Sequence, residues 1–262
     1  MPYTRDGEGR LYYEVRGAGP PVVLLHGFGE EGRALRPLAQ ALARHYRVLV
    51  PDLPGYGRSA PQPRTFPLDF YRQDALRLLA WLAALGLDQV HLGGFSDGAE
   101  VALWIAILDP QRIRSLLAWG VAGALEAAAL PEIAAIGRLV DAPPAAWRAW
   151  CAALCRTYGR EGAHLLTTRW AATLQAIIAA GGEISLARAG EIRCPTLLIN
   201  GADDSMNPPA LAQRLAARIP GANLVIVPDT GHAVHEERPA WFEATARAWL
   251  ARPLNSGTPS IE

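Results

Sequence analysis

The fold-deciding stretch of the chain reads Gly93-Gly94-Phe95-Ser96-Asp97-Gly98-Ala99. An apolar run at residues 89–93 leads into it, and apolar residues at helical spacing follow over residues 99–108. The pattern predicts a strand, a sharp turn and a helix, because glycines on both sides of a serine permit a strained backbone that bulkier residues block. The Ser96 hydroxyl would then stand above the sheet, with the N-terminus of a helix behind it. Unpaired amides at a helix N-terminus favour developing negative charge, so Ser96 is a candidate nucleophile.

The composition is that of one large α/β domain. The chain has 262 residues, half of them hydrophobic, and its formal net charge is zero. Nothing in this balance favours nucleic acid or an anionic membrane surface as a partner, so a small molecule is the expected ligand. The sequence leaves the oligomeric state open.

The cysteines and the N-terminus bear on the compartment. Cys151, Cys155 and Cys194 form no disulfide framework, and no cluster of His or carboxylate residues at metal-ligand spacing accompanies them. We therefore expect buried thiols and neither a metal nor a cofactor. The N-terminal residues lack the apolar core of a signal peptide, and no apolar run is long enough to span a bilayer. These features predict a cytoplasmic protein.

Strand and helix patterns alternate through most of the chain. Strands are predicted at residues 11–16, 22–25, 47–50, 89–93, 113–119, 195–200 and 223–227, and helices at 30–46, 68–85, 99–108, 209–219 and 240–251. Turn residues 6–9 would join the first of these strands to a preceding edge strand as a hairpin. The alternation predicts a parallel sheet with right-handed crossovers.

Residues 123–190 break this alternation. The segment is Ala-rich and helical, with Pro143-Pro144 and several glycines as interruptions. A helical block between two strands predicts a lid over the carboxyl edge of the sheet. The chain would then consist of an α/β core (1–122 and 191–253), the lid (123–190) and a flexible tail (254–262). Trp147, Trp150 and Trp170 either pack the lid against the core or line an acyl pocket, and Trp147 and Trp150 are our candidates for substrate contact.

Ser96 needs partners, because serine is a weak nucleophile at neutral pH. A base must take its proton, and an acidic residue must orient that base. Both should lie on loops at strand ends, downstream of the serine. Asp203 and Asp204 follow the strand at 195–200, and His232 follows the last strand. The order Ser, Asp, His is the one expected for α/β-hydrolases.

Five landmarks in sequence order make essentially the whole chain resemble the α/β-hydrolase fold family. They are His26-Gly27-Phe28-Gly29, residues 52–59, Gly94-Phe95-Ser96-Asp97-Gly98, Gly201-Ala202-Asp203-Asp204 with Pro208, and Gly231-His232. The resemblance implies a mostly parallel eight-stranded sheet flanked by helices, with the lid inserted after strand 6. It makes Ser96 the nucleophile and His232 the general base. It also favours Asp204 over Asp203 as the acid, because Gly201 and Pro208 set the register of the family pattern.

The resemblance also assigns roles to the loops around Ser96. It implies an oxyanion hole made of the backbone amides of Phe28 and Asp97. His26 is expected to brace the oxyanion loop rather than act as a base. Asp52 and Arg58 are expected to fix their own Pro- and Gly-rich loop.

The side chain of Asp97 is an unusual feature, since many family members carry an uncharged residue after the serine. The Ser96-Asp97-Gly98 run is similar to that of the biphenyl hydrolase-like and valacyclovir hydrolase group, in which the equivalent acid is associated with amino-acid esters. This likeness implies that Asp97 points into the pocket and selects a positive group on the substrate. The alternative is that Asp97 serves the first turn of its helix, where acids are favoured.

The predicted function is a cofactor-free serine hydrolase that cleaves small carboxylic esters, amine-bearing esters among them, through an acyl-enzyme. A lactonase, a carbon–carbon bond hydrolase or a perhydrolase would use the same residues. Epoxide hydrolases and haloalkane dehalogenases are disfavoured, because they carry Asp where this chain has Ser96. A lipase remains conceivable, although the lid shows no clear amphipathic surface helix. A ligand-binding protein of the same fold is the alternative from another class, and the intact triad argues against it.

Overall fold

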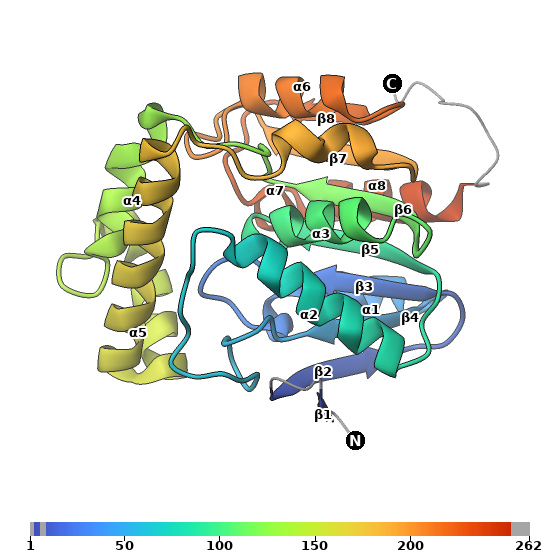
Figure 1. The fold of residues 1–262 in the computed structure, drawn as a ribbon, viewed down its shortest axis with the longest axis horizontal. Helices are drawn as coiled ribbons and strands as arrows, with labels where there is room; N and C mark the ends of the chain where they lie inside the picture. The colour runs from blue at the N-terminus through green and yellow to red at the C-terminus, as the bar shows by residue number, and fades with distance from the viewer. Residues whose placement is uncertain (1–2, 6–8, 253–262) are drawn as a thin grey trace.

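The computed structural model describes residues 3–5 and 9–252. Within them lies an eight-stranded sheet in the order β1-β2-β4-β3-β5-β6-β7-β8 (Figure 1). The strands are β1 (Tyr3–Arg5), β2 (Arg10–Arg16), β3 (Pro21–Leu25), β4 (Arg47–Pro51), β5 (Val90–Phe95), β6 (Ile113–Trp119), β7 (Thr196–Gly201) and β8 (Asn223–Val227). β1 and β2 form the predicted antiparallel hairpin, β2 pairs antiparallel with β4, and β3 to β8 are parallel. The predicted fold class is thus confirmed.

Eight helices lie in the described residues, and all but the fourth and fifth surround the sheet (Figure 1). They are α1 (Arg36–Leu42), α2 (Phe70–Ala84), α3 (Asp97–Leu108), α4 (Leu130–Gly137), α5 (Arg148–Ala179), α6 (Pro209–Arg218), α7 (Val234–Glu237) and α8 (Pro239–Ala251). None of these helices in the described part of the chain is long and apolar enough to cross a membrane. The predicted tail, residues 254–262, lies outside the described residues.

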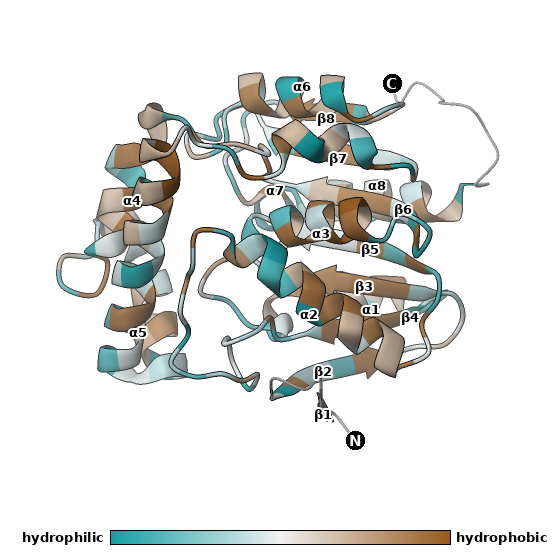
Figure 2. Cartoon of the chain, in the orientation of Figure 1, coloured by the Kyte–Doolittle hydropathy of each residue, from teal (hydrophilic) through white to brown (hydrophobic). Residues whose placement is uncertain are grey.

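The core has two halves, one on each face of the sheet, because successive residues of a strand point to opposite faces. Val22 and Leu24 of β3 pack with α1 and α8, whereas Val23 and Leu25 pack with α2 and α3. Hydrophobic residues dominate the central strands (Figure 2), and four of the five residues of β3 are buried. Burial on both faces explains why these strands read as continuous apolar runs.

The helix predicted over residues 30–46 is shorter than expected. A 3₁₀ turn at Gly32–Leu35 comes first, and α1 begins only at Arg36. Pro37 stands in the first turn of α1, where its missing N–H breaks no helical hydrogen bond, so a new helix can start there. The side chain of Asp52 also accepts the Gly32 N–H, which holds the start of the 3₁₀ turn against the end of β4.

The segment between β6 and β7 contains α4 and α5, which lie beside the body of the domain rather than on a face of the sheet (Figure 1). It is not one regular helical block. A 3₁₀ turn at Ala127–Ala129 precedes α4, another at Ala145–Trp147 precedes α5, and Gly159 breaks α5 with φ of 70°. The β-type bridge between Ala124 and Glu183 brings the two ends of the segment together.

Glu100 on α3 ties both ends of this segment to the core. Its carboxylate accepts the N–H of Gly123, where the segment begins, at 2.7 Å, and the hydroxyl of Ser185, near its end, at 2.8 Å. Burial raises the pKa of Glu100 to about 7, and the hydrogen bonds from Ser185 and Gly123 oppose that rise. A single buried side chain thus joins two points about 60 residues apart in the chain.

Candidate active site

The turn at Ser96 has the strained geometry that its glycines predict. β5 ends at Phe95, α3 begins at Asp97, and Ser96 between them has φ of 52° and ψ of −120°. A Cβ atom at Gly98 would collide with backbone oxygens of the loop after β3, and one at Gly94 would collide with the Gly98 carbonyl. Strand and helix therefore approach too closely for any larger residue. This positive φ at a residue other than glycine marks the position as a functional candidate.

Three side chains from three loops form one hydrogen-bonded chain. His232 lies after β8, and its Nε2 is 2.9 Å from Ser96 Oγ. Its Nδ1 is 2.8 Å from Oδ2 of Asp204, which lies after β7. The other oxygen of Asp204 accepts the N–H groups of Met206 and Asn207. Asp204 is buried, whereas its neighbour Asp203 is exposed, so the structure brings together the three residues that the sequence analysis selected.

The pKa of His232 is raised above its ordinary value of 6.5. Burial alone would lower it, but the hydrogen bond from Nδ1–H to Asp204 and the charge of that carboxylate outweigh burial. A histidine that takes the proton of Ser96 must first be neutral. Protonation therefore removes the base, and it does so at a higher pH than for an ordinary histidine.

We expect kcat/KM for ester hydrolysis to fall with decreasing pH along a limb whose apparent pKa lies above 6.5. The measurement is a pH–rate profile between pH 5 and 9. Glu30 is a second group that titrates in this range, because burial raises its pKa to about 7. The control is therefore Glu30→Gln, which should keep the limb and move its midpoint only slightly to lower pH, because the charge of Glu30 interacts with protonated His232. A rate that stays constant down to pH 5 would contradict His232 as the base.

The amides of Phe28 and Asp97 come from the loop after β3 and from the first residue of α3. Neither N–H donates a hydrogen bond to another of the residues that the structure describes. Gly27, between Phe28 and the end of β3, packs so closely that a Cβ atom there would lie 2.9 Å from the Phe95 ring. The loop after β3 is thus pressed against the turn that carries Ser96, and the amides of Phe28 and Asp97 both lie next to that turn.

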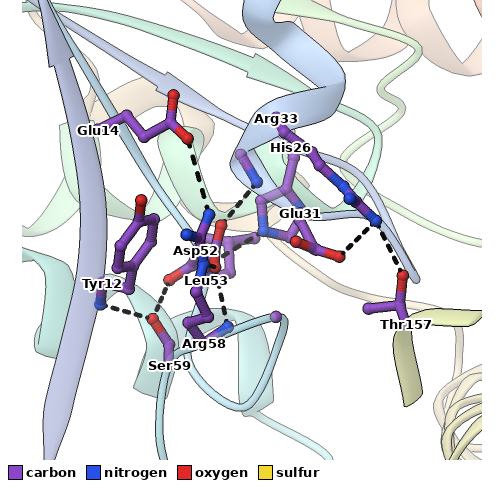
Figure 3. Close-up of polar contacts among 12 residues, drawn as sticks. Tyr12, Glu14, His26, Glu31, Arg33, Asp52, Leu53, Arg58, Ser59 and Thr157 are labelled. Carbon is purple, nitrogen blue, oxygen red and sulfur yellow. Dashed lines mark hydrogen bonds and ion pairs between the residues drawn. The ribbon is translucent and has the colours of Figure 1, made fainter. Parts of the chain in front are cut away.

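His26 braces the oxyanion loop, as predicted. Its Nδ1–H donates to the Gly27 carbonyl at 2.8 Å. Its Nε2 accepts the N–H of Leu53 at 2.9 Å (Figure 3). Complete burial lowers the pKa of His26 to about 4, so the ring stays neutral and keeps both bonds. Asp52 accepts the N–H of Arg58 and fixes the Pro- and Gly-rich loop in the same way (Figure 3).

A cavity of about 680 Å³ lies beside Ser96 and His232. Trp147 and Trp150, the two predicted substrate contacts, both line it and meet edge to face with ring centroids 5.9 Å apart. Trp170 lines it as well. The helical segment between β6 and β7 therefore contributes a wall of the cavity that contains the candidate nucleophile.

The side chain of Asp97 is not where the amine-binding interpretation needs it. It is buried, it is not among the residues lining the cavity, and its two oxygens accept hydrogen bonds from Tyr71 Oη at 2.8 Å and Trp170 Nε1 at 2.9 Å. Burial raises its pKa to about 6, while these two donors favour the charged form. The expectation that Asp97 contacts the substrate is thus corrected. Tyr71 on α2 and Trp170 on α5 already donate to its two oxygens.

Sequence reasoning missed two features of the cavity wall. Trp170 was not singled out from the other tryptophans, because helical spacing does not say which of them reaches Ser96. Glu30 follows the oxyanion loop and accepts the Gly27 N–H at 2.9 Å. Its place directly after His26-Gly27-Phe28-Gly29 was the available signal.

The chain belongs to the alpha/beta hydrolase family, whose pattern it matches over residues 22–245. It is 30% identical over 259 residues to a putative carbamate hydrolase RutD of Azorhizobium caulinodans, an alignment that covers 92% of this chain and 95% of the relative. It is 31% identical to a pimeloyl-[acyl-carrier protein] methyl ester esterase of Aeromonas salmonicida, with coverage of 89% and 96%. The crystal structure of an enol-lactonase from Burkholderia xenovorans superimposes with a TM-score of 0.75 at 25% identity, covering 96% of this chain and all of the other.

Proposed function

We propose that this protein is a serine hydrolase that cleaves small carboxylic esters through an acyl-enzyme. The observation that carries the proposal is the hydrogen-bonded chain from Ser96 through His232 to Asp204 beside the cavity. Ser96 Oγ attacks the carbonyl carbon while His232 Nε2 takes its proton, and the amides of Phe28 and Asp97 receive the oxyanion. His232 then gives the proton to the leaving alcohol, and water, deprotonated by the same histidine, releases the acid and frees Ser96.

The segment between β6 and β7 serves as the lid in this proposal. Its tryptophans Trp147 and Trp150 would contact the acyl or alcohol part of the substrate, because both line the cavity beside Ser96. The three cysteines of the chain are free thiols, which fits a reducing compartment and the cytoplasmic location that we propose.

A carbamate is the second candidate substrate, favoured by the 30% identity to the RutD relative. The same attack on a carbamate carbonyl gives a carbamyl-enzyme, which hydrolyses more slowly because its nitrogen feeds electrons into the carbonyl. The panel that tests both consists of p-nitrophenyl acetate, butyrate and octanoate, a p-nitrophenyl carbamate and a lactone. Steady turnover of the short esters supports the esterase, and faster steady turnover of the carbamate favours the alternative. Turnover of none of them overturns the proposal.

The charge of the cavity wall predicts a preference among esters. The lining carries four carboxylates, Glu30, Glu31, Glu132 and Glu236, against the single guanidinium of Arg33. Arg33 is moreover only 2.9 Å from Glu31, and burial raises the pKa of Glu30 to about 7, so Glu132 and Glu236 supply most of the unbalanced negative charge of the lining at neutral pH. Substrates with a carboxylate should be disfavoured there and amine-bearing esters tolerated or preferred. This preference rests on the cavity wall and not on Asp97.

We expect kcat/KM for mono-p-nitrophenyl succinate to lie at least about ten-fold below that for p-nitrophenyl butyrate at low salt. Glu236→Gln removes one carboxylate and should narrow this gap by about two- to five-fold, since Glu236 is exposed and partly screened. Glu243→Gln on α8 is the matched control, because Glu243 does not line the cavity, and the gap should persist. Equal rates for the two esters would contradict the electrostatic argument.

A further inference from the structure

One side chain, that of Trp170, contacts the side chains of both residues whose backbone amides are proposed for the oxyanion hole. The indole of Trp170 stacks on the ring of Phe28, with centroids 4.3 Å apart and an interplanar angle of 27°. Its Nε1–H donates to the carboxylate of Asp97 at 2.9 Å. Phe28 and Asp97 belong to different elements, the loop after β3 and the start of α3. The pairing of β3 with β5 brings these two elements together, and the contacts of Trp170 add a link between the two side chains.

The contacts of Trp170 leave it little freedom. The side chain is buried, with 4% of its surface exposed, and a second donor, Tyr71 Oη on α2, holds the other oxygen of Asp97. Any rotation of the Asp97 carboxylate away from the indole would therefore break a buried hydrogen bond. Trp150 meets the Phe28 ring edge on at 6.1 Å and confines it from another direction.

We propose that Trp170 is a positioning residue that clamps the oxyanion hole. The proposal rests on the function proposed above. Two donors stabilise an oxyanion only when both lie within hydrogen-bond distance of the same point, and shifts well below 1 Å matter. Because Trp170 stacks on the Phe28 ring and donates a hydrogen bond to Asp97, it holds the amides of these two residues at a fixed spacing. Because Trp170 lies on α5, it also makes that spacing depend on how the helical segment sits on the core.

The competing explanation is simple packing, in which Trp170 only fills space beneath the lid. The two explanations predict different kinetics. A packing residue affects stability and the amount of folded enzyme, and it leaves the chemistry of folded molecules alone. A clamp acts on the transition state, so its loss lowers kcat while KM changes little.

The decisive variant is Trp170→Phe, which keeps a ring against Phe28 and loses the N–H that reaches Asp97. We expect kcat for p-nitrophenyl butyrate to fall about ten-fold with KM within two-fold of wild type. The affinity for a trifluoromethyl ketone, which forms a tetrahedral adduct with the serine, should fall by the same factor. Trp170→Leu, which loses both contacts, should lower kcat about 100-fold. If it does not fold, the Phe variant still carries the test.

Two further variants separate the clamp from other effects. Tyr71→Phe removes a hydrogen bond to the same carboxylate without touching the bridge, so kcat should fall no more than about three-fold. Trp104→Phe on α3 controls for the loss of an indole elsewhere and should leave kcat unchanged. A Trp170→Phe enzyme with wild-type kcat and wild-type ketone affinity, whatever its Tm, overturns the clamp alone. A wild-type protein that hydrolyses no ester or carbamate overturns the proposed function and the clamp with it.

Discussion

Ser96→Ala is expected to lower kcat for ester hydrolysis by about 10⁴- to 10⁶-fold and to leave KM for the residual reaction close to that of the wild type. The substitution removes a single non-hydrogen atom, Ser96 Oγ, which lies 2.9 Å from His232 Nε2. Without it no acyl-enzyme can form, and the remaining rate comes from water attacking a substrate held in the cavity. Initial rates with p-nitrophenyl butyrate measure the loss.

A covalent probe gives a second readout of Ser96. A fluorophosphonate should label the wild type in a one-to-one ratio and leave Ser96→Ala unlabelled. Ser205→Ala is the control. Ser205 is the exposed neighbour of Asp204, its hydroxyl donates to Glu132, and it has no role in the proposed reaction. A Ser96→Ala protein that keeps more than a tenth of the wild-type rate would show that another nucleophile is at work.

Asp204→Asn is the second large effect that we expect, a loss of about 10⁴-fold in kcat with the fold intact. Oδ1 of Asp204 accepts two backbone N–H groups, so the amide oxygen of asparagine must take that place. The amide NH₂ then faces His232 Nδ1, where the carboxylate oxygen had accepted the Nδ1–H hydrogen bond. Nδ1 becomes an acceptor, the proton moves to Nε2, and Nε2 can no longer take the proton of Ser96.

Asp203→Asn is the matched control for this substitution. Asp203 is the adjacent residue, is exposed, and has no contact with His232 in the structure, so the rate should stay within about two-fold of wild type. The measurement is kcat for both variants alongside their thermal unfolding curves. An equal loss in both variants would indicate that the loop after β7, and not the carboxylate of Asp204, is what the reaction requires.

The positions of the strands along the chain and their mostly parallel arrangement could be predicted from the sequence, because their signals are local. Buried parallel strands appear in the sequence as apolar runs. The turn at Ser96 is marked by Gly94 and Gly98, where a side chain would collide with neighbouring backbone atoms. The register around Asp204 also followed from short spacings, Gly201 and Pro208, that a family pattern fixes. The path of the α4–α5 segment and the positions of its breaks could not be predicted from local sequence, because they depend on how the segment packs against the core.

Asp97 illustrates the limit most clearly. Its position at the start of a helix was predictable, but the direction of its side chain depends on Tyr71 and Trp170, which lie 26 and 73 residues away in the chain. The sequence supplied a carboxylate next to the nucleophile and no means to see its partners. The same limit hid Trp170, whose importance comes from one contact with Phe28 and one with Asp97.

The attachment of the helical segment at Glu100 has a consequence for how such enzymes diversify. Gly123 and Ser185, at or near the two ends of the segment, both bond to the buried carboxylate of Glu100. This attachment to the core does not depend on the length of chain between the two residues. The entropic cost of closing a longer or shorter loop there changes only slowly with its length. A different segment joined between those two residues would leave β5, β7 and β8 in place, but it would have to supply its own counterpart of Trp170 to keep the contacts with Phe28 and Asp97.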